Sequence, residues 1–172
     1  METFSTIGDI ANNLLGARTR HVWDYWCAKW SGDRAPGWST FNLMDLYKDA
    51  PICLVLDVLP GSDPIDYRYR YVGTMIVQYR WKLDVPDHTG LTFFEARHQY
   101  DFSEVKIIYD RCTTTGLPAL MHRNFDAHDA TGVHERLVLP LTAPDGKVDK
   151  LVVVVERLRE TLKSTRTEAQ LF

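Results

Sequence analysis

Few histidine and carboxylate side chains in this chain of 172 residues have a spacing that could support hydrolytic chemistry. His134-Glu135 supplies the first two residues of a zinc-protease motif, which needs a second histidine one helical turn later so that both rings face one metal ion. Val138 occupies that position, and the surrounding apolar residues predict a strand rather than a helix. We therefore reject the zinc-protease interpretation.

Three histidines, His134 among them, could be close in space. His122, His128 and His134 fall on two predicted strands that are joined by a turn. A zinc site needs three or four ligands at suitable spacing, and no cysteine or carboxylate cluster accompanies these histidines. Surface or hairpin histidines explain them better, so the sequence predicts no metal site.

Nucleophilic catalysis has no recognisable motif. The chain contains neither a GxSxG elbow nor a glycine-rich phosphate loop. Cys53 lies in an apolar run, where burial disfavours a reactive thiolate, and Asp126 and Asp129 flank a turn, where solvated turn chemistry accounts for them. We therefore predict no catalytic residues and expect that the protein is not an enzyme.

Composition indicates one ordinary globular domain. Hydrophobic residues make up 45% and charged residues 25% of the chain, with a net charge of −3. This balance argues against nucleic-acid binding. Three scattered cysteines without a CxxC motif indicate a reducing compartment, and the N-terminus lacks the pattern of a signal peptide. Apolar runs of five or six residues are too short to span a membrane. We expect a cytoplasmic protein with no nucleic-acid or membrane partner.

The pattern of apolar residues predicts two strands, then helices, then three strands. Helical periodicity indicates an N-terminal helical region, a short helix after Asn42, one over 75–81 and a long one over 101–115, where Asp101 and Glu104 have capping-box spacing. This order implies one antiparallel sheet whose helices cross a single face. The predicted strands are 52–59, 65–73, 118–128, 134–143 and 147–156.

The second predicted strand carries the clearest candidate for a ligand site. Tyr67, Tyr69 and Tyr71 alternate with Arg68 and Arg70, so we expect the tyrosines to face inward and the arginines to face water. Such a row gives an apolar wall with polar tips, which pockets use to orient ligands. Aromatic residues also pack well beneath helices, and simple core packing is the favoured interpretation for Tyr71.

Arg136 is the second component of the predicted site. Because Glu135 and Arg136 are neighbours on one strand, one of them must face the inner side of the sheet. An inward Arg136 would need a carboxylate partner or an anionic ligand, and a protein carboxylate is the simpler of the two. The predicted pocket-lining residues are Tyr69, Tyr71, Phe93, Tyr109, Met121 and Arg136.

A tryptophan stripe is predicted on an early helix. Trp23, Trp26 and Trp30 have helical spacing. The stripe either docks on the chain's own sheet or packs against the same helix of a second copy. We favour a mixture of the two, and predict that these tryptophans form a homodimer interface.

Several segments occur in an order that suggests a family. They are WDYWCAKW (23–30), YRYVGT (69–74), DHTG (87–90), the helix with Tyr109, and ERLVLPL (135–141). With these segments in this order, the chain resembles a PAS domain, and more closely the single-domain PAS-like family found mostly in alphaproteobacteria. One departure is Val85-Pro86, where the family tends to have a glycine.

The resemblance implies an α+β fold with a five-stranded antiparallel sheet in the order 2-1-5-4-3. Helices on one face would enclose a sensing pocket. The implied organisation is an N-terminal helical extension (1–20), a PAS-like domain (21–158) and a charged C-terminal tail (159–172). The implied function is that of a sensory or regulatory module in signal transduction. Such a module binds a small ligand, or mediates protein interaction and dimerisation, and has no output domain of its own, so a signalling protein partner would supply the output.

The marks of specific cofactors do not carry over. No cysteine stands in the context used by flavin photosensors, and the helix over 101–115 contains no histidine that could ligate haem. The cofactor is therefore left unknown.

Two alternatives remain open. A small cone-shaped α+β enzyme of the isomerase or dehydratase type would need an acid–base pair, for which His98 or His122 with Asp57 are the candidates. The interruption by helices after two strands favours the PAS-like order instead. A purely structural dimerisation domain would have a filled core around Tyr69, Phe93, Tyr109 and Met121.

Overall fold

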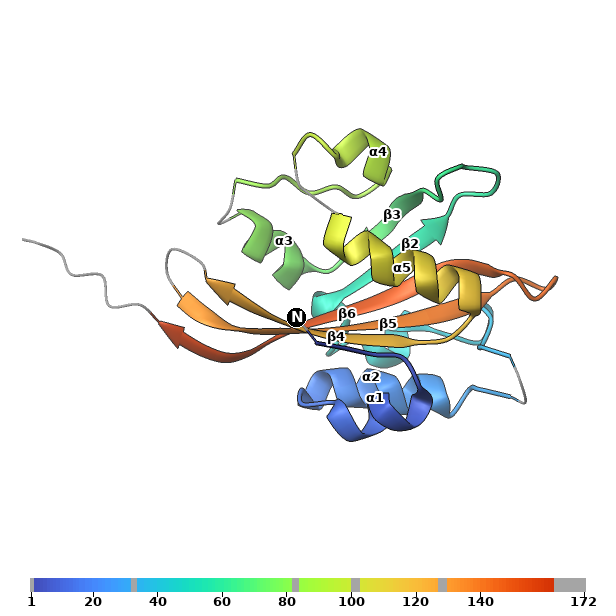
Figure 1. The fold of residues 1–172 in the computed structure, drawn as a ribbon, viewed down its shortest axis with the longest axis horizontal. Coiled ribbons are helices and arrows are strands. Elements are labelled where there is room, and N and C mark those ends of the chain that lie inside the picture. Colours follow the sequence, from blue (N-terminus) through green and yellow to red (C-terminus); the bar gives the residue numbers. More distant parts are fainter. Residues whose placement is uncertain (1, 32–33, 82–83, 100–102, 127–129, 163–172) are drawn as a thin grey trace, which may run out of the picture.

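One antiparallel sheet organises the chain (Figure 1). The strand order is β1-β4-β5-β6-β2-β3. The strands are β1 (Glu2–Phe4), β2 (Cys53–Val58), β3 (Tyr67–Val72), β4 (Ala119–Asp126), β5 (Ala130–Thr142) and β6 (Val148–Leu162). The structure is a computed structural model, and it describes residues 2–31, 34–81, 84–99, 103–126 and 130–162.

The α+β class agrees with the sequence analysis, but the expected five-stranded sheet has to be corrected. A sixth strand, β1, pairs with β4 and adds to the edge of the sheet. Read from the opposite edge, the other strands follow the order β3-β2-β6-β5-β4. The sequence does not indicate β1, because its three residues are too few to display a periodic pattern.

Five α-helices accompany the described strands, and side chains cap several helix starts. Thr6 accepts a hydrogen bond from the backbone N–H of Asp9, and Asn42 caps the following 3-10 turn as expected. The expected Asp101 cap lies outside the described residues. The helices are α1 (Ile7–Asn13), α2 (Ala17–Cys27), α3 (Thr74–Trp81), α4 (Phe93–Ala96) and α5 (Ser103–Thr115), with 3-10 turns η1 (Leu43–Leu46) and η2 (Ala50–Ile52).

Helices cover both faces of the sheet, which corrects the expectation of a single covered face. Figure 1 shows α1 and α2 on one side and α3, α4 and α5 on the other. We call the side under α3–α5 the inner face and the side under α1 and α2 the outer face. In β6, Leu151 and Val153 belong to the inner core, whereas Val152 and Val154 belong to the outer core. A strand that is apolar at every position must be covered on both sides.

The N-terminal segment is an integral part of this fold. The expected boundary at residue 20 falls inside α2, and β1 belongs to the common sheet. Ile10 of α1 and Trp26 of α2 are fully buried, and the indole N–H of Trp26 donates to the carbonyl oxygen of Pro140 at 3.0 Å. The first 27 residues therefore complete the outer core.

The last strand continues further than expected. β6 runs beyond the predicted strand end at residue 156 to Leu162, which pairs with Ala130 at the start of β5. Pairing with β5 outweighs the charged, helix-favouring composition of this stretch. Residues 163–172 of the predicted tail lie outside the described residues. Within the described chain, no helix has the length and apolar character needed to cross a membrane.

Candidate functional site

Aromatic side chains fill the centre of the inner face. Tyr67 and Tyr69 of β3 point inward as predicted, with exposed fractions of 0% and 1%. The ring of Phe93 from α4 stacks on Tyr69 at 5.0 Å between centroids, and Tyr109 of α5 lies 5.9 Å from Phe93. Met121 is buried in the same core. Here the structure agrees with the filled core of the structural alternative.

Tyr71 does not belong to this cluster, which corrects its assignment to the pocket. The register between β2 and β3 shifts, because Val55 is paired with Tyr71 and the next residue of β2, Leu56, with Tyr69. Arg70 is thus an extra residue that reverses the alternation. Tyr71 packs against the outer core, and its hydroxyl donates to the carbonyl oxygen of Ala50 at 3.1 Å.

A small cavity lies beside the aromatic core, between α3, α5 and the inner face. Its volume is about 90 Å³. Of the predicted ligand residues, Met121 and Arg136 form part of its wall. Tyr109 does not line the cavity, but its hydroxyl accepts a hydrogen bond from Arg136. The complete lining is Leu54, Ile76, Tyr79, Arg80, Val105, Met121, Arg123, His134, Arg136 and Val155.

Arg136 faces inward and keeps one unsatisfied donor. One terminal guanidinium N–H donates to the hydroxyl of Tyr109, and the guanidinium carbon lies 5.9 Å from the centre of that ring. The Nε–H of Arg136 is buried and has no hydrogen-bond partner among the described residues. The inward arginine of the sequence analysis is therefore present without the protein carboxylate that was the simpler expectation.

His134 shares the inner face with Arg136, and the sequence analysis did not place it in the site. Its ring stacks on Phe125 at 4.4 Å between centroids. Burial lowers the pKa of His134 to about 4, with further lowering by Arg136, Arg157 and Arg123. The period of two along β5 could have identified this residue, because His134 and Arg136 must face the same side.

Arg80 of α3 forms part of the cavity wall on the side of the helices. Its guanidinium donates to the Tyr69 hydroxyl at 3.4 Å and lies 3.4 Å from Nδ1 of His88. His88 is fully buried, and Nε2 lies 3.0 Å from the side-chain oxygen of Gln99. Desolvation, aided by Arg80, lowers the pKa of His88. The DHTG turn thus contributes a neutral histidine that links the cavity to the aromatic core.

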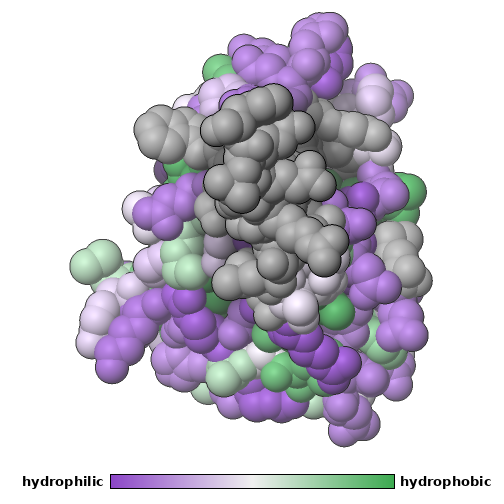
Figure 2. Space-filling model, turned by 90° about the vertical axis from the view of Figure 1, so that its left-hand side faces the viewer, coloured by the Kyte–Doolittle hydropathy of each residue, from purple (hydrophilic) through white to green (hydrophobic). Residues whose placement is uncertain are grey.

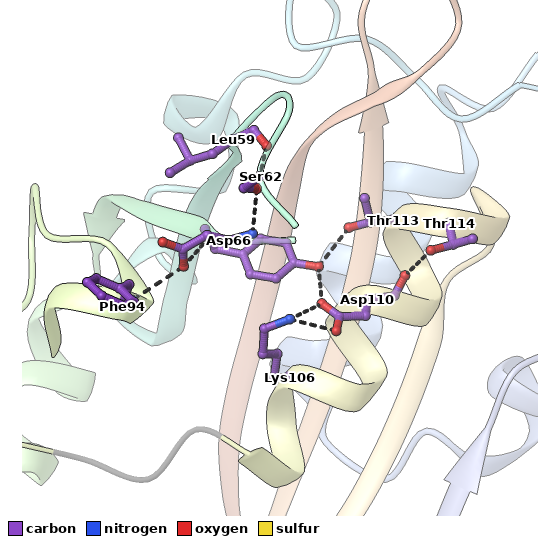
Figure 3. Close-up of polar contacts among 9 residues, drawn as sticks. Leu59, Ser62, Asp66, Phe94, Lys106, Asp110, Thr113 and Thr114 are labelled. Atoms are coloured by element: carbon purple, nitrogen blue, oxygen red, sulfur yellow. Dashed lines mark hydrogen bonds and ion pairs between the residues drawn. The ribbon is translucent and has the colours of Figure 1, made fainter. Parts of the chain in front are cut away.

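A larger groove, with a volume of about 630 Å³, opens between α4, the first turn of α5 and the segment that precedes β3. Two of its charged groups, Asp66 and Lys106, are engaged in contacts within the chain (Figure 3). Asp66 accepts from the backbone N–H of Tyr67 at 2.8 Å and of Phe94 at 3.3 Å. Lys106 binds both carboxylate oxygens of Asp110 at 2.7 and 2.8 Å. The groove is lined by Ser62, Asp63, Pro64, Ile65, Asp66, Phe93, Phe94, Arg97, Ser103 and Lys106.

Tyr67 connects this groove to α5. Its hydroxyl lies 2.8 Å from Asp110 and 3.1 Å from Thr113, both of which are visible in Figure 3. Burial raises the pKa of Tyr67 well above its usual value, so the hydroxyl stays protonated and acts as a donor. The network fixes α5 on β3, and it uses the polar groups that a groove ligand would need.

The outer face carries one buried and one partly buried carboxylate, Glu135 and Glu156, which hold the start of α2. Glu135 is fully buried and accepts hydrogen bonds from the backbone N–H groups of Leu15 at 2.7 Å and Gly16 at 2.9 Å. Glu156, which is paired with Glu135 on the adjacent strand β6, accepts hydrogen bonds from the backbone N–H and the hydroxyl of Thr19 at 2.9 and 2.8 Å. His122 lies 2.8 Å from Glu135. These carboxylates satisfy the free N–H groups of a helix start.

The tryptophan stripe packs mainly within the chain. Trp23 and Trp26 are 3% and 0% exposed against the outer face, and Trp30 is partly buried beside Trp26. Their own sheet therefore covers the first two rings, which corrects their assignment to a dimer interface. The described residues form a single chain without a partner copy, and the homodimer stays a prediction.

The predicted acid–base pairs do not come together. Asp57 forms an ion pair with Arg70 at 2.7 Å, and His122 contacts Glu135 instead. His98 is exposed after α4. A pair of the enzyme alternative is thus absent from the inner cavity as far as the described residues extend.

The cysteine and histidine positions give no metal centre in the described part of the chain. No group of three or more metal-ligating side chains occurs there, and His128 lies outside it. Cys53 and Cys112 are fully buried, whereas Cys27 is partly exposed. Burial raises the pKa of Cys53 to about 12 and of Cys27 to about 11, which disfavours a thiolate.

Comparison with known proteins adds little. No protein-family model matches the chain, and no curated protein matches it. A solved structure described as an RNA-binding Light-Oxygen-Voltage receptor aligns with a TM-score of 0.43 at 13% sequence identity. The alignment covers 67% of this chain and 31% of that one, so this chain spans about a third of its length. A match at this level carries no argument about the present site.

Proposed function

We propose that this protein is a PAS-type sensory or regulatory module of the cytoplasm, which binds a small ligand on the inner face of its sheet. The observation that carries the proposal is the cavity between α3, α5 and the sheet, into which Arg136 brings a buried N–H without a partner among the described residues. A buried polar group without a partner is costly. A ligand that satisfies it would offset this cost.

The arrangement of elements supports the same proposal. β2 and β3 directly precede α3, α4 and α5, three strands follow, and these helices cover the inner face (Figure 1). Concave sites with few polar groups on a rigid scaffold are typical ligand sites. Function cannot be taken from fold alone, so the proposal depends on the cavity.

A sensor must also transmit the binding event. A ligand shifts an equilibrium only if it prefers one of two arrangements. β5 provides a short connection, because Arg136 lines the inner cavity while the adjacent Glu135 holds the start of α2 on the outer face. We propose that a ligand at Arg136 alters the docking of α2 through β5. A homodimer or a signalling partner would respond to that change.

Native mass spectrometry, followed by denaturing release of bound compounds, tests the proposal. We expect a stoichiometric small molecule that leaves on denaturation. Hydrogen exchange measured with and without that compound should then differ in α2. A protein that carries no compound and shows no ligand-dependent exchange in α2 would contradict the sensory function and favour a dimerisation module.

One observation favours the enzyme alternative. His122, paired with Glu135, borders a second pocket of about 260 Å³ that also includes Asn124 and Arg159. However, both oxygens of Glu135 accept backbone N–H bonds at the start of α2, which gives this pair a structural role. Incubation of the released compound with the protein distinguishes the two functions. Chemical conversion that stops in His122→Gln would establish the enzyme.

A further inference from the structure

The register of the central strands places cationic side chains in a row on the inner face. His134 of β5 is paired with Arg123 of β4 on one side and with Arg157 of β6 on the other. Arg136, two residues along β5, faces the same side and forms part of the same cavity wall as His134 and Arg123. The lowered pKa of His134 leaves its ring neutral near pH 7, so Arg123, Arg136 and Arg157 concentrate positive charge around it, and negative charge nearby would compensate them.

The protein supplies part of that compensation. Glu104 forms an ion pair with Arg123 at 2.7 Å, but the two side chains are 52% and 46% exposed, so water weakens the interaction. Arg157 lies over the rings of Tyr79 and Phe125, at 4.6 and 4.3 Å from their centres.

Arg136 lies deeper in the cavity. Its described hydrogen-bond partner is the hydroxyl of Tyr109, which is a neutral group. The buried Nε–H of Arg136 has no partner in the described part of the chain. Arginine presents its N–H groups as a planar fork that fits a carboxylate or phosphate. The position therefore has both the charge and the donor geometry to bind an oxyanion.

The pKa of His134 is sensitive to the charges around this position. Burial and the surrounding arginines lower its pKa to about 4. The neutral ring still offers one N–H donor beside the arginines. An oxyanion bound next to it would favour the protonated ring and raise this pKa.

From this placement we propose that the inner cavity binds the carboxylate or phosphate group of a small metabolite, held by Arg136 with Arg123 and His134 beside it. The inference rests on the proposed sensory function and names the class of its ligand. A volume of about 90 Å³ corresponds to the space of roughly three water molecules. This space suits an oxyanion group and is too small for a flavin or haem.

Isothermal titration calorimetry with inorganic phosphate and with acetate provides the test. Sodium chloride at equal ionic strength removes general salt effects. We expect at least one oxyanion to bind the wild-type protein, and Arg136→Gln to weaken the binding at least about tenfold. Arg68→Gln removes the same charge from an exposed position on β3, and should leave the affinity unchanged.

Histidine NMR gives a second readout that does not depend on how well the variant folds. The titration midpoint of His134 should rise on addition of the oxyanion that binds. The absence of oxyanion heat beyond that of chloride would overturn the proposal, as would equal affinity in Arg136→Gln and Arg68→Gln.

The same experiments separate this inference from the sensory function. An oxyanion that binds at Arg136 without changing hydrogen exchange in α2 would leave the site in place and contradict the sensor. A neutral compound released from the native protein, with hydrogen exchange in α2 that depends on it, would support the sensor and overturn the oxyanion site.

Discussion

Glu135 and Arg136 are neighbours on β5, yet the chain supplies hydrogen-bond partners for the carboxylate and leaves one donor of the guanidinium without a partner among the described residues. Glu135 lies on the outer face, where the start of α2 and His122 supply three hydrogen-bond donors. Arg136 lies on the inner face, where it reaches a neutral tyrosine hydroxyl and keeps a buried N–H without a partner among the described residues.

The cross-strand rows repeat this difference. On the outer face His122, Glu135 and Glu156 lie side by side, and α2 compensates the two carboxylates. On the inner face the adjacent row contains Arg123, His134 and Arg157. The chain itself satisfies the buried charge of Glu135, whereas it leaves a buried donor of Arg136 without a partner among the described residues, and on this donor we base the proposed binding site.

The largest effect is expected from Glu135→Ala. The change removes the acceptor of the N–H groups of Leu15 and Gly16, and leaves the N–H group of Gly16 in a buried position. We expect a loss of about 3 kcal/mol in the free energy of unfolding, measured by urea denaturation. Glu104→Ala removes an exposed carboxylate and should cost no more than about 0.5 kcal/mol. Equal losses in the two variants would refute a structural role for Glu135.

Gly16→Ala tests how closely α2 approaches the carboxylates. A Cβ atom at Gly16 would lie 2.1 Å from Oε2 of Glu156 and 2.9 Å from Oε1 of Glu135. Because Thr19 holds Glu156 in place, we expect a loss of about 1–3 kcal/mol, again measured in urea. Gly8→Ala is the control, since no heavy atom lies within 4 Å of its added Cβ. In α1 that change should be neutral or stabilising by up to about 1 kcal/mol. Similar results for both glycines would mean that α2 is not held closely.

The pH dependence of stability tests the inner row. The pKa of His134 falls from 6.5 to about 4 on folding, so the unfolded chain binds a proton that the folded chain does not. Stability should therefore decrease as pH falls from 6.5 to about 4. His88, whose pKa is also lowered, acts in the same direction. His134→Gln should reduce the slope of unfolding free energy against pH without abolishing it. The exposed residue His98 provides the control variant, His98→Gln. An unchanged slope in both variants would contradict the lowered pKa of His134 in the folded protein.

The smallest effect is expected from Arg136→Gln in buffer without carboxylate or phosphate. The change removes a buried guanidinium N–H without a partner among the described residues, together with the hydrogen bond to Tyr109. These effects oppose each other, so stability should change by no more than about 1 kcal/mol. A loss as large as that of Glu135→Ala would show that Arg136 serves the fold, and the contrast between the two residues would disappear.

Much of the sheet could be predicted from local patterns. The apolar run of β2 and the alternation in β3 were recognised, as was the capping role of Asn42. Tyr71 was misplaced because a register shift between strands leaves no mark in the sequence of one strand. The course of β6 to Leu162 was missed because its partner, Ala130, is distant in sequence.

The candidate site was recovered in part. Met121 and Arg136 line the cavity as predicted, whereas Tyr69 and Phe93 stack on each other in the filled core. Arg123 could have been added by counting in steps of two from Met121 along its strand. Arg80 could not, because it comes from α3, whose position over the sheet depends on tertiary packing.

The sequence by itself determined most of the segments that become strands and helices, since periodicity and capping are local properties. It also determined that Glu135 and Arg136 must face opposite sides of the sheet. Only the tertiary structure decided which charge is satisfied. The packing of α1 and α2 on the outer face brings backbone donors to Glu135, whereas the inner face brings further cations to Arg136. Hydrogen bonds between residues over a hundred positions apart depend on how the elements pack, and no local pattern encodes them.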